Sequence, residues 1–153
     1  MRISYENEIF KPPEMVFPWI AEPSNAMEWQ KNVKGGEIIL DKPEKIGTTF
    51  KEIIEEDGKS LEMHGTITQY IKNKIIGFHL KSRIHEFDVT YSIEALGKGT
   101  KISIEAMIGW KFPMNIVSLF IGKKIKAGLI KQLESETLEL KRLCEAEQNG
   151  IGI

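Results

Sequence analysis

Three side chains that can transfer protons lie on predicted strand faces that are otherwise apolar. They are Glu52, His85 and Tyr91, and each alternates with apolar neighbours at a period of two residues. A carboxylic acid that is half-buried in an apolar pocket has a raised pKa and can donate or accept a proton. If the three faces line one pocket, their side chains would support a cyclase- or dehydratase-like reaction on a polar ligand.

The same pattern has a purely structural interpretation. Glu52 could turn outward at a bulge, His85 could face water at the start of its strand, and Tyr91 could be a core residue with its hydroxyl at the edge. Hydrophobic patterning assigns strand faces poorly near turns, so both interpretations remain open.

The motifs of metal, nucleotide and serine-nucleophile enzymes are missing from the sequence. The chain has three histidines and one cysteine, with no HExxH or CxxC spacing. The segment GKGT at 97–100 lies between two predicted strands and opens no helix, so we expect a hairpin turn there instead of a phosphate loop. There is no Gly-x-Ser-x-Gly elbow. We therefore predict no metal and no cofactor.

Alternating hydrophobicity predicts an antiparallel sheet of about seven strands. The last two strands place apolar residues on one face and charged or polar residues on the other, which is typical of a sheet with one face in water. The predicted strands cover residues 2–10, 35–40, 48–56, 61–71, 75–82, 85–95 and 100–110.

A proline-rich stretch after the first strand predicts two short helices. The Pro-Glu pair at 13–14 suits a first helical turn, and Pro18 predicts a kink or a break into two short pieces. Ser24 or Asn25 would cap a second short helix that holds Trp29. A curved sheet cannot contact a straight helix along its whole length, so these short helices would fill the remaining gap.

After Pro113 the apolar residues recur at three- and four-residue spacing, which predicts an amphipathic helix of about 30 residues and about 45 Å. Only the sheet is large enough to cover its apolar stripe. The start of the helix, 113–128, is apolar on several sides. It could close over a pocket, pack against a second subunit in a homodimer, or contact a membrane surface. The stripe consists of Val117, Phe120, Ile121, Ile125, Leu129, Leu133, Leu140 and Cys144.

Length and composition fit a single domain. The 153 residues can form one core, and 21 Lys and Arg against 22 Asp and Glu argue against a nucleic-acid partner. No run reaches the roughly 18 apolar residues of a spanning helix. The lone cysteine and the lack of a signal peptide predict a cytoplasmic location. We assign residues 1–145 to the domain and 146–153 to a flexible tail.

Several stretches resemble one superfamily. They are PPEMVFPWIAEPSNAMEW near the start, GTTF at 47–50, GTITQY leading to KIIGFHL, TYSIEALGKGTKISI, and the terminal amphipathic helix. Over roughly residues 1–145 the chain resembles the START-related, polyketide cyclase and Bet v 1-like (SRPBCC) superfamily. This resemblance implies an α+β helix-grip fold. In that fold a curved antiparallel sheet of about seven strands wraps around a long C-terminal helix, with two short helices after the first strand.

The resemblance leaves three functions open, because one scaffold serves several of them. The leading hypothesis is binding of a small hydrophobic or amphipathic ligand in an internal pocket between the sheet and the C-terminal helix. The alternatives are a polyketide cyclase- or dehydratase-like enzyme that uses acid and base residues of the pocket, and a co-chaperone-like interaction domain that uses the outer face of the sheet. The candidate pocket residues are Trp29, Phe50, Glu52, Met63, Phe78, His85, Phe87, Tyr91, Trp110, Phe120 and Ile121.

Overall fold

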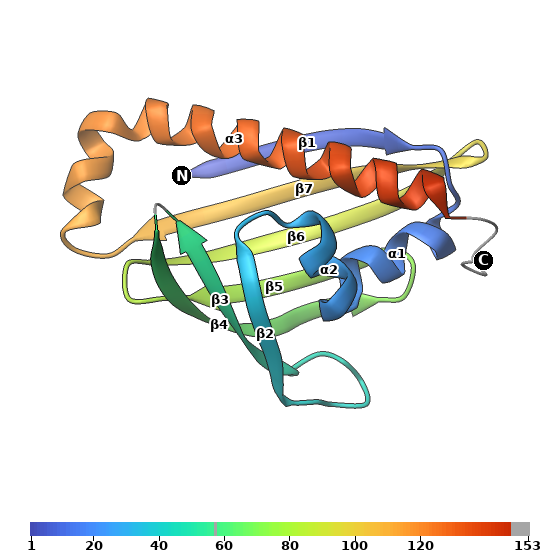
Figure 1. Ribbon diagram of the computed structural model, residues 1–153, viewed down its shortest axis with the longest axis horizontal. Coiled ribbons are helices and arrows are strands. Elements are labelled where there is room, and N and C mark those ends of the chain that lie inside the picture. Colours follow the sequence, from blue (N-terminus) through green and yellow to red (C-terminus); the bar gives the residue numbers. More distant parts are fainter. Residues whose placement is uncertain (57, 148–153) are drawn as a thin grey trace.

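The computed structural model describes residues 1–56 and 58–147, apart from the side chain of residue 56. Within these ranges it contains one sheet and three helices (Figure 1). The elements in chain order are β1 (Arg2–Ile9), α1 (Pro13–Ala21), α2 (Pro23–Trp29), β2 (Val33–Leu40), β3 (Thr49–Glu56), β4 (Lys59–Ile71), β5 (Ile75–Lys81), β6 (His85–Leu96), β7 (Gly99–Trp110) and α3 (Met114–Ala146).

The sheet is antiparallel throughout, with its strands in the order β1-β7-β6-β5-β4-β3-β2. The two helices that follow β1 carry the chain across to β2, so β1 and β2 form opposite edges. In Figure 1 the helix α3 runs alongside β1 and β7, and β2, β3 and β4 curve away below it. The helix-grip fold predicted from the sequence is therefore confirmed.

The register places apolar side chains in rows on the concave face. Tyr91 on β6 is opposite Ile104 on β7 and Ile76 on β5, and all three are buried. The next residue along, Ser92, belongs to the opposite face, as the pleat requires. The two-residue turn between β6 and β7 contains Gly97 at φ 61°, which confirms the predicted hairpin.

The short helices differ from the prediction in two details. Pro18 lies within one continuous helix α1 instead of splitting it, and the helix ends when the Glu22 amide donates to the Pro18 carbonyl. Glu22 is also the N-cap of α2, because Pro23 occupies its first helical position with a preset φ. Ser24 and Asn25 are therefore not caps, and the Asn25 amide donates to the Pro18 carbonyl instead.

Helix α3 is longer than the sheet can cover. Its 33 residues span about 50 Å, whereas the 12 residues of β7 span about 40 Å. The backbone leaves helical geometry at Ile121, with φ −120° and ψ 17°. Leu140 and Cys144, after this kink, are fully buried against the sheet. The prediction that the whole stripe lies on the sheet is wrong for its start, because Val117, Phe120 and Ile121 are exposed.

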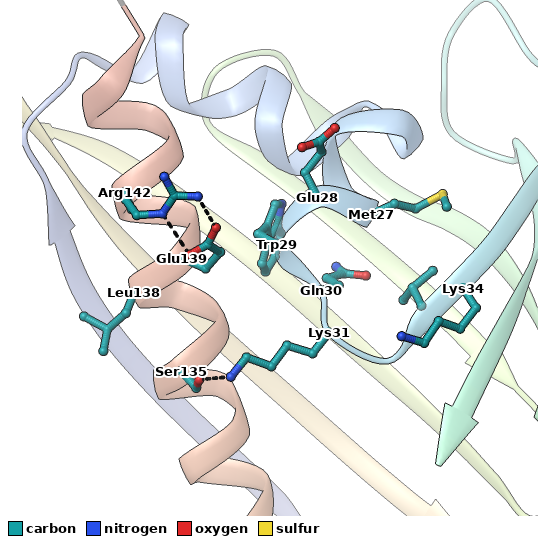
Figure 2. A pocket seen from close by; sticks show the side chains of 11 residues that line it. Met27, Glu28, Trp29, Gln30, Lys31, Lys34, Ser135, Leu138, Glu139 and Arg142 are labelled. Carbon is teal, nitrogen blue, oxygen red and sulfur yellow. Dashed lines mark hydrogen bonds and ion pairs between the residues drawn. The ribbon is translucent and has the colours of Figure 1, made fainter. Parts of the chain in front are cut away.

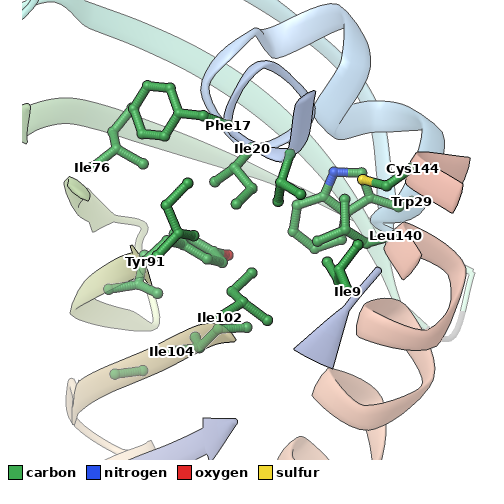
Figure 3. Close-up of a cluster of buried hydrophobic side chains, with 14 of the residues drawn as sticks. Ile9, Phe17, Ile20, Trp29, Ile76, Tyr91, Ile102, Ile104, Leu140 and Cys144 are labelled. Carbon is green, nitrogen blue, oxygen red and sulfur yellow. The ribbon is translucent and has the colours of Figure 1, made fainter. Parts of the chain in front are cut away.

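A single hydrophobic core fills the end of the molecule where α1, α2 and the last turns of α3 meet the sheet (Figure 3). Burial raises the pKa of the Cys144 thiol to about 12, so this cysteine is an unreactive core residue. The labelled core side chains are Ile9, Phe17, Ile20, Trp29, Ile76, Tyr91, Ile102, Ile104, Leu140 and Cys144.

Most of the predicted tail, 148–153, lies outside the described residues. Ala146 still belongs to α3, and the Glu147 carboxylate accepts a hydrogen bond from Trp19 Nε1 at 3.0 Å. Single-domain organisation of residues 1–145 stays a prediction. Among the described helices, none is long and apolar enough to cross a membrane.

Candidate functional site

An open groove of about 640 Å³ lies between the second half of α3 and the segment that joins α2 to β2 (Figure 2). One wall comes from the end of α2 and the start of β2, and the other comes from one face of α3. Of the predicted pocket residues, only Trp29 lines it. The lining residues are Met27, Glu28, Trp29, Gln30, Lys31, Val33, Lys34, Ser135, Leu138, Glu139 and Arg142.

The polar side chains of this groove are partly paired with one another. Arg142 donates two hydrogen bonds to Glu139, at 3.0 and 2.5 Å, and the Lys31 ammonium donates to the Ser135 hydroxyl. No described residue forms an ion pair with Lys34. The lining of the groove therefore mixes charged side chains of both signs with the apolar Met27, Trp29, Val33 and Leu138.

Glu136, which follows the groove residue Ser135 on α3, was missed by the sequence analysis. Its carboxylate accepts a hydrogen bond from the backbone amide of Lys31 at 2.8 Å and one from the side-chain Nε2 of Gln132 at 3.5 Å. Burial raises the pKa of Glu136, although these hydrogen bonds oppose the shift. The available signal was its position in the stripe, three residues after Leu133 and four before Leu140.

Glu52 projects from β3 on the concave side, in line with Phe50 and Ile54 as predicted. No described residue pairs or hydrogen-bonds with its carboxyl group, and burial raises the pKa of this group to about 7. A hollow of about 20 Å³ lies against it, a volume that suits a single water molecule. This hollow shares Met27 and Val33 with the groove, so Glu52 lies just beyond the groove wall.

A row of aromatic rings crosses the concave face from α2 to β3. Trp29 and Tyr91 meet edge to face with ring centroids 6.2 Å apart, Tyr91 and Phe78 also lie at 6.2 Å, and Phe78 and Phe50 lie at 5.7 Å. Edge-to-face pairs of this kind stabilise a wall beyond their area burial. No described residue is hydrogen-bonded to the Tyr91 hydroxyl.

Burial raises the pKa of Tyr91, and the nearby carboxyl groups of Glu136 and Glu52 raise it further. The phenol therefore stays protonated at neutral pH. Two acids and one phenol, from α3, β3 and β6, thus influence one interior region. That Glu52 and Tyr91 act at one site stays a prediction, and Glu136, which the sequence analysis did not name, is a third ionisable group near Tyr91.

His85 does not join this group. It lies six residues from Tyr91 on the same strand, a separation of about 20 Å along β6. Its Nδ1 lies 2.7 Å from the Ser82 hydroxyl, and its ring centroid is 5.2 Å from that of Trp110 and 5.3 Å from that of Phe87. The half-buried imidazole is therefore part of a separate cluster at the far end of the sheet.

Comparison with protein families identifies the chain. A family model described as Activator of Hsp90 ATPase homolog 1-like protein matches residues 11–135. The chain belongs to this family. Because the family is a member of the SRPBCC superfamily, the predicted resemblance is confirmed. No sequence among the curated proteins matches the chain.

Solved structures of other proteins share the fold of this chain. TTHA0849 from Thermus thermophilus has a TM-score of 0.79 and 16% identity, with 95% of this chain and 98% of that chain covered. SA2116 from Staphylococcus aureus, described as a protein of unknown function, has a TM-score of 0.71 and 12% identity, with 95% of each chain covered. Ara h 8.0201 has a TM-score of 0.65 and 16% identity, with 96% and 99% covered.

The remaining predicted pocket residues of this family member are spread over two regions. Met63 is buried on the concave face beside Glu52. Phe87 and Trp110 belong to the His85 cluster, where the Trp110 indole nitrogen is buried without a hydrogen-bond partner. Phe120 and Ile121 lie on the exposed start of α3, so the prediction that they line the pocket receives no support from their position.

Proposed function

We propose that this protein binds a small amphipathic ligand in the groove along α3, with the polar end of the ligand directed through the shared Met27–Val33 wall toward the hollow beside Glu52. The observation that carries the proposal is the Glu52 carboxyl group. A half-buried acid without a partner destabilises a folded protein, and such groups concentrate where a fold serves binding or catalysis.

The surrounding groups suggest the chemistry of the ligand. With a pKa of about 7, Glu52 is partly protonated at neutral pH and can either donate or accept a hydrogen bond. The protonated Tyr91 hydroxyl can donate one. The aromatic row offers an apolar wall next to these groups. We infer a ligand with an apolar ring or chain and one uncharged polar group, such as a hydroxyl or a carbonyl.

The test uses the apolar fluorophore N-phenyl-1-naphthylamine together with native mass spectrometry of the purified protein. We expect the probe to bind up to about tenfold more tightly at about pH 5.5 than at about pH 8.5, because an apolar guest excludes water from Glu52 and so disfavours its ionised form. In Glu52→Gln this pH dependence should disappear.

Glu55→Gln is the matched control, because it makes the same change on the same strand at an exposed position. It should behave as the wild type does. Absence of both probe binding and any co-purified mass would contradict the proposal. A pH dependence that persists in Glu52→Gln would remove Glu52 from the site.

The two alternatives have less support. A cyclase-like enzyme would retain Glu52 and Tyr91 but not His85, which lies about 20 Å along the strand from Tyr91. A co-chaperone-like role would use the outer face of the sheet. That face is charged and internally paired, for example where His79 lies 2.8 Å from Asp88 and 2.7 Å from Glu86. Both remain predictions, and no contact among the described residues favours either.

A further inference from the structure

The start of α3 forms an exposed apolar projection. We define the apolar arm as residues 112–121. Phe112, Leu119 and Phe120 are 76%, 82% and 83% exposed, which is unusual for large apolar side chains. Further exposed members are Ile116, Val117 and Ile121.

The arm lies beyond the sheet and does not pack on it. In Figure 1 the orange start of α3 lies beyond the end of β7 and turns at the kink into the part of the helix that follows β1. At 100° per residue, the exposed apolar side chains from Ile116 to Ile121 cover about 200° of the helix circumference. A helix that fits a groove on a partner protein needs only one apolar stripe.

The charge around the arm is of one sign. Residues 106–133 contain five lysines and no acidic residue, whereas the rest of the chain has 16 Lys and Arg against 22 Asp and Glu. Lys123, Lys124 and Lys126 follow directly after the arm, and no described residue forms an ion pair with them. An otherwise acidic protein thus carries three lysines, Lys123, Lys124 and Lys126, directly after the apolar arm, and we call these three residues the lysine collar.

We propose that the apolar arm docks this protein on an anionic membrane surface. Phe112, Leu119 and Phe120 would enter the boundary between headgroups and acyl chains, and the lysine collar would lie against the anionic headgroups. Charge complementarity and the wide apolar circumference both fit a fluid bilayer, which can surround the arm. The proposal is independent of the ligand site.

A second copy of the chain fits the arm less well. A two-fold contact through the same surface would bring the collars of two protomers together, and the like charges would repel. A rigid partner protein would cover one side of the arm and leave the other side in water. Both occupants are nevertheless separate outcomes of the test below.

Vesicle flotation tests the proposal with the full chain. We expect binding to phosphatidylcholine vesicles that contain about 30% phosphatidylserine, weak binding to phosphatidylcholine alone, and a loss of affinity between about 50 and about 500 mM salt. The double variant Leu119→Gln/Phe120→Gln should lower the partition coefficient roughly tenfold or more, since both apolar groups are lost. Lys123→Gln/Lys124→Gln/Lys126→Gln should lower it similarly and remove most of the salt dependence.

Matched controls lie at the opposite end of the sheet. Ile71→Gln/Leu96→Gln changes two exposed apolar residues beside the β4–β5 and β6–β7 turns, and Lys72→Gln/Lys74→Gln/Lys98→Gln removes three charges there. Both should bind as the wild type does. No binding of the wild type to anionic vesicles would overturn the proposal. So would equal losses in arm and control variants, or a dimer dispersed by the arm variant without vesicle binding.

A site-specific probe separates insertion from simple adsorption. Phe120→Cys can be labelled with an environment-sensitive NBD dye, because the only native cysteine, Cys144, is fully buried. The emission should rise and shift to shorter wavelength with anionic vesicles. The same label at Leu96→Cys should not respond. Equal responses at the two positions, or none at Phe120→Cys, would overturn insertion of the arm.

Discussion

At the scale of single residues, Glu52 connects the chemistry of this protein to its stability. The folded state holds the pKa of the carboxyl group at about 7, above its ordinary value of 4.5, because burial disfavours the charged form. The folded protein therefore binds more protons than the unfolded chain between these two values. The ionisation of Glu52 does not lower the free energy of unfolding below about pH 4.5. It lowers this free energy progressively as the pH rises, and the loss reaches its full value above about pH 7.

Glu52→Gln should accordingly stabilise the protein in a pH-dependent manner. We expect the free energy of unfolding to rise by about 2–3 kcal/mol at about pH 8 and by less than about 1 kcal/mol at about pH 5. Urea unfolding at the two pH values measures the difference. Glu55→Gln should change neither value appreciably, and an equal gain at both pH values for Glu52→Gln would show that the folded carboxyl group has an ordinary pKa.

At the scale of elements, α3 has two parts with different roles. After the kink, its buried face packs on the core through Leu140 and Cys144, and the other side lines the groove through Leu138 and Arg142. Before the kink, the apolar arm has no such packing. The short helices α1 and α2 complete the core from the other side, where Trp29 donates from its indole nitrogen to the Trp19 carbonyl at 2.8 Å.

Two leucines two positions apart on α3 provide a direct test of this arrangement. Leu140→Ala should lower the free energy of unfolding by about 2–5 kcal/mol, because it leaves a cavity at a side chain with 0% exposure. Leu138→Ala, at 53% exposure on the groove side, should cost no more than about 0.5 kcal/mol. Chemical denaturation of both variants gives the comparison, and similar losses would contradict the orientation of the helix.

At the scale of the whole molecule, the two ends of the sheet differ in how they are covered. The end that holds α1, α2 and the last turns of α3 contains the fully buried core. The other end has the half-buried His85 cluster and the apolar arm. The concave face is thus closed at one end and less completely covered at the other.

Hydrogen exchange should report this asymmetry. Amides of residues 116–121 should exchange at least about 100-fold faster, after correction for intrinsic rates, than those of residues 133–144, because only the latter segment is anchored by buried side chains. Mass spectrometry of the exchanging protein resolves the two segments. Equal protection on both sides of the kink would mean that the arm is covered in solution.

Much of the fold could be predicted because hydrophobic periodicity is a local property. Alternation at a period of two put Glu52 in line with Phe50, and Tyr91 in line with its apolar neighbours, but left open whether Glu52 turns outward at a bulge. The structure keeps Glu52 in register opposite Met63, without a bulge. The close packing of side chains was harder to predict from the sequence. A Cβ at Gly65 would lie 2.2 Å from the Phe50 ring, so this glycine makes room for that ring, and nothing in the sequence indicates it.

The sequence by itself determined the strands, their faces, the terminal helix and the family, because side-chain period and turn chemistry depend on neighbours in the chain. Only the tertiary structure decided which of these residues meet. The separation of about 20 Å between His85 and Tyr91 is an exception, because it follows from the rise of six residues along one strand. The excess length of α3 over the sheet left the apolar arm exposed, and the crossing of α3 over the sheet placed Glu136 near Tyr91. Distances of this kind are set by sheet curvature and helix length together, which no local pattern contains.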